Sequence, residues 1–190
     1  MIPQLLVHDH ILVNKMKYGV RVPFGSTWLA KWGKPQRGEI VVFRYPNNPD
    51  VFYVKRVIGL PGERISISHG VVQIDGQPLE LAEQAVDSKD LEENPDSEFR
   101  YFLENRNYQV RYLNKEEAEM EAIDLPEDHY FMMGDNRDQS SDSRSWGSVP
   151  FENLIGTPVL VWLSCEETFE TARFLCDPSQ MRWQRILMRL

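Results

Sequence analysis

The sequence predicts a mostly β fold, built on an antiparallel sheet with few short helices. Two apolar, β-branched runs at residues 39–45 and 51–58 are separated by the turn-forming residues 46–50, which is typical of a hairpin. Residues 64–76 then alternate between apolar and polar side chains and turn at two Xaa-Gly pairs, which indicates a β-meander. Neighbouring strands are therefore expected to be joined by short turns.

Composition restricts the possible functions less than the motifs do. A chain of 190 residues with 42% hydrophobic residues is long enough for one domain with a buried core. The net charge of -8 argues against a nucleic-acid partner, which normally requires a basic surface. No apolar stretch approaches the roughly 18 residues of a membrane-spanning helix, and no signal-like leader opens the chain. The chain as given is not expected to anchor itself.

The first elements are short. Residues 9–15 predict a strand with a buried apolar centre. His8 and His10 lie at strand spacing, but without a Cys/His cluster elsewhere they do not predict a metal site. Residues 18–36 show no clear period and predict an extended excursion. Its tryptophans, Trp28 and Trp32, either pack on the core, which is favoured, or lie near a membrane interface.

The run at 39–45 is too continuously apolar for a strand with one wet side, so it predicts a buried strand. Lys55 lies in the next apolar strand, beside Val54 and Val57. Burial would lower the pKa of this ammonium and suit it to act as a base near neutral pH. The alternative is a lysine on the solvent side of an edge strand, which spacing alone favours.

The middle of the chain changes character. Between Glu83 and Glu98 seven acidic residues stand against one lysine, which predicts an insertion loop of low order. Strand character returns at 99–113. Residues 114–124 predict either a short acidic helix or another loop, ended by Pro126.

A polar run follows at Gly134–Pro150, rich in Gly, Asn, Asp, Ser and Arg. It fits neither the helix nor the strand period, so it predicts a structured loop locked by Asp/Arg ion pairs. Beyond it, residues 158–164 predict a buried strand and 169–175 its partner. Residues 181–190 either lie on a membrane as an amphipathic helix or cap the core.

The two cysteines leave a choice open. Cys165 and Cys176 could bridge if they flank a hairpin, but two buried thiols fit the same spacing. Sequence does not decide between them.

Three segments together resemble a known family. Gly134–Pro150 resembles the most diagnostic segment of the bacterial type I signal peptidases, membrane-anchored serine-lysine endopeptidases also called leader peptidases. Tyr53–Glu63 resembles the segment that contains the family's catalytic lysine, and Arg37–Phe43 resembles the strand before it. All three stand in the family's order.

The resemblance implies an antiparallel β core of the signal-peptidase type, formed by residues 1–78 and 129–165. An inserted, smaller variable β subdomain would occupy 79–128, and 166–190 would form a C-terminal hairpin and tail. No cofactor is implied.

The resemblance also implies roles for individual residues. Lys55 would be the catalytic base and Ser140 would orient it, while Asp142 and Arg144 would hold the loop rigid. Asp135, Asn136, Arg137 and Asp138 would support the loop, and Trp146, Val149 and Pro150 would pack at its exit. The side chains that match the family's substrate pocket are Met1, Leu5, Tyr53 and Val54.

The first residues match only part of a family segment. Met1–Leu6 resembles the second half of Ser-Met-x-Pro-Thr-Leu, with Gln4 in place of the usual threonine, which puts local support of the loop in question. The nucleophilic serine would stand immediately before Met1, so the chain as given is expected to be inactive. A chain cut after the serine, a reading frame begun at the wrong methionine and a homologue that has lost catalysis all fit.

The expected function is removal of signal peptides from secreted preproteins, with cleavage after small residues. The resemblance places such an enzyme in the inner membrane, held by an N-terminal anchor that is absent here, with its catalytic domain on the periplasmic, extracytoplasmic side. One alternative is a non-catalytic domain that binds extended peptides by strand addition. A self-cleaving repressor-type protease is disfavoured, because no DNA-binding domain accompanies the long Gly134–Pro150 segment.

Overall fold

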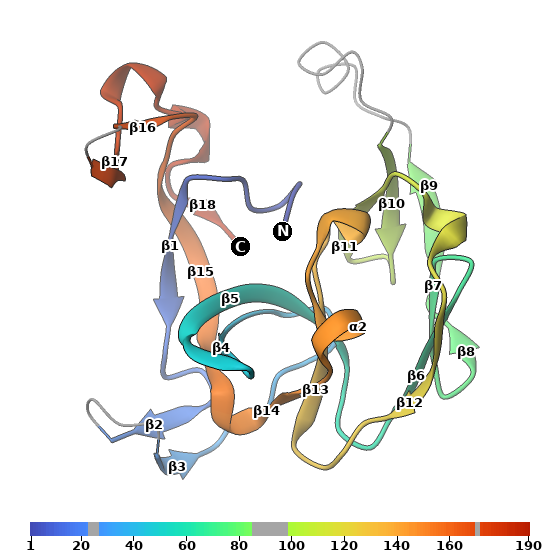
Figure 1. Ribbon diagram of the computed structural model, residues 1–190. Helices are drawn as coiled ribbons and strands as arrows, with labels where there is room; N and C mark the ends of the chain where they lie inside the picture. Colours follow the sequence, from blue (N-terminus) through green and yellow to red (C-terminus); the bar gives the residue numbers. More distant parts are fainter. Residues whose placement is uncertain (23–26, 85–98, 170–171) are drawn as a thin grey trace.

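The structure is a computed structural model that describes residues 1–22, 27–84, 99–169 and 172–190. It consists mainly of antiparallel strands with short helical turns between them, so the predicted mostly β fold class is confirmed (Figure 1). Part of the expected acidic insertion loop, residues 85–98, lies outside the described residues.

The largest sheet has the strand order β1-β15-β4-β5-β13-β14, with β18 also paired to β15. Its strands are β1 (Asp9–Asn14), β15 (Leu154–Ser164), β4 (Ile40–Tyr45), β5 (Asn48–Gly59), β13 (His129–Met133), β14 (Val149–Pro150) and β18 (Met188–Arg189). The predicted hairpin is β4 and β5, with Val41 opposite Lys55. Because β5 already begins at Asn48, the turn is shorter than residues 46–50.

The expectation for the first strand is only partly correct. Strand β1 forms, but its centre is not buried, because Leu12 is 53% exposed. Successive side chains of a strand point to opposite sides. Ile11 therefore packs against the core cluster of Leu5, Ile40 and Val161, while Leu12 points to solvent.

The predicted excursion at 18–36 contains a hairpin in its described part. Strands β2 (Gly19–Arg21) and β3 (Trp28–Lys31) pair, and residues 23–26 lie outside the described residues. Trp28 packs against Phe151, with ring centres 5.2 Å apart, as the favoured alternative predicted. Trp32 is 59% exposed.

Two smaller sheets lie beside the large one (Figure 1). One has the order β12-β6-β7-β8, with strands β6 (Arg64–Ser68), β7 (Val71–Ile74), β8 (Gln77–Pro78) and β12 (Met120–Asp124). The other has the order β11-β10-β9, with strands β9 (Leu81–Gln84), β10 (Arg100–Glu104) and β11 (Tyr108–Tyr112). The predicted β-meander is therefore confirmed.

Residues 114–124 differ from both predicted forms. A single 3-10 turn, η1 (Lys115–Glu117), leads into β12, which pairs with β6. Met120 and Ile123 pack against the cluster that joins the two small sheets to the ends of β5 and β13. Their burial depends on a partner strand about 55 residues earlier, so the acidic composition alone suggested the wrong element.

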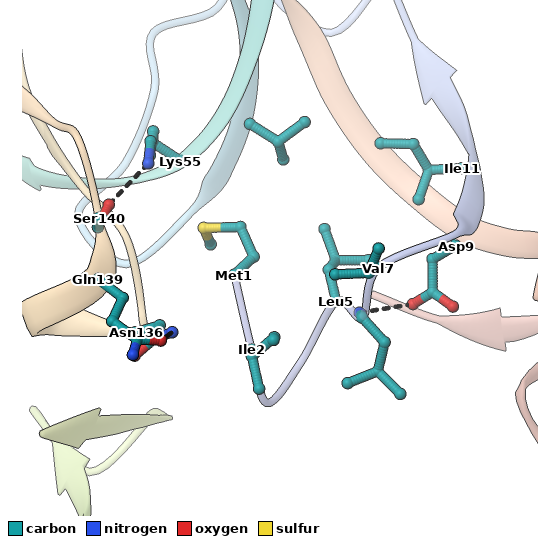
Figure 2. A pocket seen from close by; sticks show the side chains of 12 residues that line it. Met1, Ile2, Leu5, Val7, Asp9, Ile11, Lys55, Asn136, Gln139 and Ser140 are labelled. Carbon is teal, nitrogen blue, oxygen red and sulfur yellow. Dashed lines mark hydrogen bonds between the residues drawn. The ribbon is translucent and has the colours of Figure 1, made fainter. Parts of the chain in front are cut away.

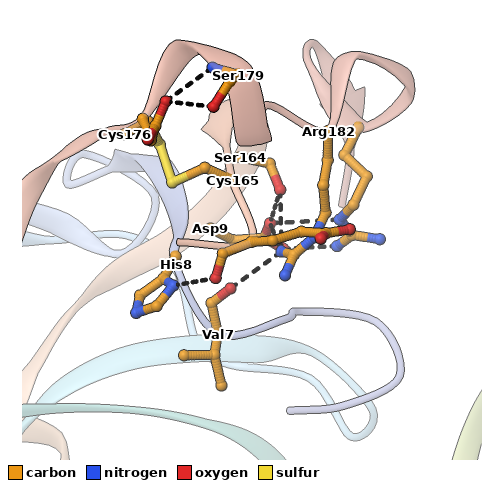
Figure 3. Close-up of a disulfide and its surroundings, with 11 residues drawn as sticks. Val7, His8, Asp9, Ser164, Cys165, Cys176, Ser179 and Arg182 are labelled. Atoms are coloured by element: carbon orange, nitrogen blue, oxygen red, sulfur yellow. Dashed lines mark hydrogen bonds and ion pairs between the residues drawn. A yellow bond between two sulfur atoms is a disulfide. The ribbon is translucent and has the colours of Figure 1, made fainter. Parts of the chain in front are cut away.

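The C-terminal region is tied to the large sheet. Strands β16 (Thr168–Phe169) and β17 (Ala172–Cys176) form a hairpin, and Cys165 and Cys176 form a disulfide with Cα atoms 5.6 Å apart (Figure 3). Two 3-10 turns, η4 (Pro178–Gln180) and η5 (Trp183–Arg185), lead to β18. Of the two predicted forms of the tail, the cap on the core is the one observed. Among the described residues, no helix is long and apolar enough to cross a membrane.

Candidate active site

Lys55 lies within β5, between β4 and β13, so the edge-strand alternative is wrong. Its side chain is half-buried. Burial lowers the pKa of its ammonium below the ordinary value; the Asp142 carboxylate opposes this effect, and the Arg144 guanidinium adds to it. The strand therefore holds an amine that loses its proton more easily than a solvated lysine.

The polar run after β13 is a structured loop, as predicted. It contains the 3-10 turn η2 (Arg137–Gln139) and the single-turn helix α2 (Ser143–Trp146), then leads through β14 into the 3-10 turn η3 (Phe151–Asn153). The buried Asp142 carboxylate accepts from the amide of Gly134 at 3.0 Å and from Arg144 Nε at 2.7 Å. Asp142 thus connects the later part of the loop to its first residue, Gly134.

The loop brings Ser140 to Lys55. Lys55 Nζ donates to Ser140 Oγ at 2.6 Å (Figure 2). Gly134 makes this approach possible, because a Cβ atom there would lie 2.2 Å from Ser140 Oγ and 3.4 Å from Lys55 Nζ. Any side chain at Gly134 would therefore displace the serine from the lysine.

Arg56 locks the start of the loop to β5. It is 4% exposed and donates to Asp135 through Nε at 2.8 Å and Nη2 at 2.7 Å. Its Nη2 also donates to Gln4 Oε1 at 2.7 Å. Gln4, which departs from the family pattern, therefore has a supporting contact to the same arginine.

Arg137 locks the loop from the other side. Its guanidinium is fully buried and forms a two-pronged ion pair with Glu104 of β10, with Nη1 2.7 Å from Oε1. Tyr108 donates its hydroxyl to Glu104 at 2.6 Å, and Arg137 donates to the hydroxyl of Tyr112 at 2.7 Å. Two strands of a small sheet thus support the loop that contains Ser140.

A cavity of about 350 Å³ opens beside the Lys55 and Ser140 side chains (Figure 2). Its lining residues are Met1, Ile2, Leu5, Leu6, Val7, Asp9, Ile11, Val54, Lys55, Asn136, Gln139 and Ser140. One wall is mostly apolar and the other is the polar loop. Within the described ranges, no group of three His, Cys, Asp or Glu side chains is placed to hold a metal ion.

Most of the predicted site residues come together here. Met1, Leu5 and Val54 line the cavity with Lys55, and Figure 2 draws Met1 between Lys55 and Leu5. Tyr53 does not line it; its ring centre lies 5.6 Å from Lys55 Nζ. The ring of Tyr53 lies on the same side of β5 as Lys55 and packs instead against the core cluster that contains Phe43 and Val57.

Comparison with known families matches residues 1–163 to the family described as signal peptidase, peptidase S26. The chain belongs to this family. The match covers the strand with Lys55, the loop with Ser140 and the residues that line the cavity.

Curated relatives in the signal peptidase family carry the name signal peptidase I. The protein from Pseudomonas fluorescens is 39% identical over 181 residues, which cover 87% of this chain and 62% of that protein. The one from Pseudomonas aeruginosa is 38% identical over 179 residues, 85% of this chain and 61% of that protein. The one from Rickettsia conorii is 36% identical over 186 residues, which cover 87% of this chain and 68% of that protein. This chain therefore spans about three fifths of the length of the Pseudomonas relatives.

A solved structure also matches. The crystal structure of a signal peptidase I from Enterococcus faecalis V583 is 32% identical, with a TM-score of 0.41, over 66% of this chain and 97% of that chain.

Sequence reasoning missed several residues around this site. Arg56 and Glu104 were not singled out, since a charged residue in a strand usually faces solvent. Asn136 and Gln139 line the cavity, although only a supporting role was expected for Asn136 and none for Gln139. One signal in the sequence could have identified Arg56: it lies within the apolar run that predicts a buried strand, directly after Lys55.

Proposed function

We propose that this domain is the catalytic core of a serine endopeptidase that removes signal peptides from secreted preproteins, cutting after small residues. Lys55 is the base, and Ser140 orients it. The nucleophile is a serine joined to the backbone nitrogen of Met1, and without that serine the domain does not cut. The observation that carries the proposal is the half-buried Lys55 amine, held 2.6 Å from Ser140 at the wall of a cavity of about 350 Å³.

The position of Met1 supports the place of the nucleophile. Burial lowers the pKa of its amino group, and the nearby positive charge of Lys55 acts in the same direction, while Asp135 opposes both. Met1 and Lys55 also line the same cavity. A residue joined to the Met1 nitrogen would therefore lie within the neighbourhood of the base.

The proposed reaction has two steps. Lys55 takes the proton of the serine hydroxyl while its oxygen bonds to the scissile carbonyl carbon, and the proton passes to the leaving amine as the C–N bond breaks. Water then gives a proton to Lys55 and attacks the acyl carbon, and the serine oxygen leaves with that proton. Ser140 holds the long lysine side chain in place, which preserves the geometric advantage of a positioned base.

The shape of the cavity supports the preference for small residues. Leu5, Ile11 and Val54 supply apolar walls, and the volume of about 350 Å³ is shared with the backbone of any bound peptide. The Cys165–Cys176 disulfide supports an oxidising compartment, as expected for a domain on the extracytoplasmic side of the membrane.

The test compares two proteins that differ in one added residue. Each begins with a short glycine leader, followed by either serine or alanine, followed by Met1. A synthetic signal peptide with alanine at the first and third positions before the cut is incubated with each protein, and the products are measured by mass spectrometry. We expect cleavage after the alanine with the serine protein alone.

Binding decides what a negative result means. Affinity for the peptide is measured with the alanine protein, which cannot form an acyl-enzyme. If the alanine protein binds the peptide and neither protein cuts it, the chain is a peptide-binding domain of the peptidase family, and the proposed activity is wrong. If neither binding nor cleavage of the peptide is observed, the proposed substrate class is also wrong.

The pH dependence of cleavage follows from the lowered pKa of Lys55. Only the neutral amine can take a proton, so kcat/KM of the serine protein should rise with pH and level off above the pKa of Lys55. Because burial lowers this pKa, the midpoint should lie below the ordinary lysine value of about 10.4. A pH-rate profile checks this, and a midpoint at or above the ordinary value would contradict the role of burial.

A further inference from the structure

Segment 1–8 precedes the first strand, so no sheet ladder fixes it. Its own backbone bonds are local: the Leu5 amide donates to the Met1 carbonyl at 3.0 Å, and the Leu6 amide donates to the Asp9 carboxylate at 2.9 Å. Leu5 also packs in a core cluster. Since five residues of this segment line the cavity, its position determines the shape of the site.

The end of the segment is fixed by a buried carboxylate. The Asp9 side chain is 1% exposed and accepts from Ser164 Oγ at 2.6 Å and from Arg185 Nη2 at 2.6 Å. Burial acts to raise the pKa of Asp9, but the hydrogen bonds from Arg185, Ser164 and the Leu6 amide outweigh it, so the pKa is lowered. Asp9 is therefore charged at neutral pH.

Two arginines of the C-terminal tail reach from this carboxylate to the segment. Arg185 Nη2 also donates to the carbonyl of Gln4 at 2.9 Å. Arg182 Nη1 donates to the carbonyl of Val7 at 3.0 Å and lies 4.0 Å from Asp9 Oδ1, as Figure 3 shows beside the disulfide. The guanidinium groups thus pair with carbonyls that have no sheet partner.

The C-terminal tail can fix the position of segment 1–8 because the tail is itself bonded to β15. The Arg182 amide donates to the Ser164 carbonyl at 2.9 Å, and the Leu187 amide donates to the Val161 carbonyl at 2.7 Å. Strand β18 pairs with β15, and Met188 packs in the same cluster as Leu5. The tail and the start of the chain are therefore fixed to the same strand.

We infer that Arg185 is a positioning residue for the proposed reaction: it bridges Asp9 and the Gln4 carbonyl and so holds segment 1–8 against the cavity. The kinetic part of this inference rests on the proposed function; the structural part does not. Arg185 acts through the backbone that leads to the nucleophile and has no contact with the reacting atoms.

The test uses three variants of the serine protein. Arg185→Gln removes the charge and one arm of the bridge. Arg185→Lys keeps the charge beside Asp9, but a single ammonium cannot reproduce the planar fork that spans both acceptors. Arg189→Gln is the matched control, since Arg189 is an exposed arginine of the same tail.

Two measurements are made on each variant. Hydrogen exchange of residues 1–9 should rise at least about tenfold in Arg185→Gln and by less in Arg185→Lys, while exchange in β4 and β5 stays unchanged. In cleavage assays kcat should fall about tenfold or more, and KM should change less, because a misplaced nucleophile slows the chemical step. The midpoint of the pH-rate profile should stay that of the parent, because Lys55 keeps its surroundings.

The outcomes separate the two proposals. If the parent serine protein does not cut, the proposed function falls, and the exchange data still decide whether Arg185 holds the segment. Unchanged exchange at residues 1–9 in Arg185→Gln would overturn the inference. So would faster exchange across all sheets, because that pattern indicates a general loss of stability, or a loss of activity equal in Arg189→Gln.

Discussion

Replacing Lys55 with methionine in the serine protein is expected to lower kcat/KM at least about a thousandfold, since general base catalysis alone contributes about 10²–10⁴ and the serine would have no other positioned base. Methionine has a similar length and no proton-accepting nitrogen. The pocket therefore stays filled while the hydrogen bond to Ser140 Oγ is lost. Initial rates with the signal peptide at saturating and limiting concentrations give both kinetic constants.

The same substitution should raise the free energy of unfolding near neutral pH. The buried ammonium is destabilising, because burial penalises its charged form. Between the lowered pKa of Lys55 and the ordinary lysine value, the unfolded parent binds more protons than the folded parent, so the parent gains stability as pH rises. The difference between variant and parent should therefore shrink at high pH. Urea unfolding at several pH values measures it.

Lys17→Met is the matched control. Lys17 is an exposed lysine just after β1, so its replacement should leave both kcat/KM and stability close to those of the parent. Activity of Lys55→Met within about tenfold of the parent would show that another group takes the proton.

Replacing Glu104 with glutamine should destabilise the protein by about 3–5 kcal/mol, the usual effect of removing one partner of a buried ion pair. Arg137 would keep its charge in a site with 0% side-chain exposure, opposite a neutral amide. The arginine cannot escape by losing its proton, because a guanidinium stays protonated in proteins near neutral pH. Urea unfolding, with linear extrapolation to water, measures the loss.

A double variant tests the cause. In Glu104→Leu/Arg137→Met both charges are replaced by apolar side chains. The loss of stability should therefore be clearly smaller than the sum of the losses measured for Glu104→Leu and for Arg137→Met as single variants. Arg64→Gln, in the exposed pair of Arg64 with Asp124, is the control and should change stability by less than about 1 kcal/mol. A loss below about 1 kcal/mol for Glu104→Gln would mean that the pair does not hold the loop.

Both predictions concern residues that hold the loop with Ser140 beside Lys55. Arg56 follows Lys55 in β5 and grips Asp135, and Arg137 grips Glu104, so the loop that presents Ser140 is held at two points. The aromatic ring of Tyr108 lies between them: Arg56 Cζ is 4.1 Å from its centre, and its hydroxyl contacts Glu104. Residues 100–112 thus stabilise the site without lining the cavity.

The elements whose signals are local could be predicted from the sequence alone. Continuous apolar runs predicted β4 and β5, alternation predicted β6 and β7, and turn residues predicted the hairpins between them. The polar run at Gly134–Pro150 identified the loop. The resemblance of this run to a family singled out Ser140, and that of Tyr53–Glu63 singled out Lys55. The strands, the hairpins and the loop depend on side chains within a few residues of each other, so periodicity and turn chemistry are sufficient to find them.

The contacts between distant segments became apparent only in the folded chain. Glu104 reads as a solvent-facing residue until β10 and β11 are seen to enclose Arg137, 33 residues later. Met120–Asp124 becomes a strand because β6 offers it a partner, and Arg185 reaches Gln4 and Asp9 across more than 170 residues. Strand register and burial create these pairs, and neither is encoded in the local pattern of residues that sequence reasoning uses.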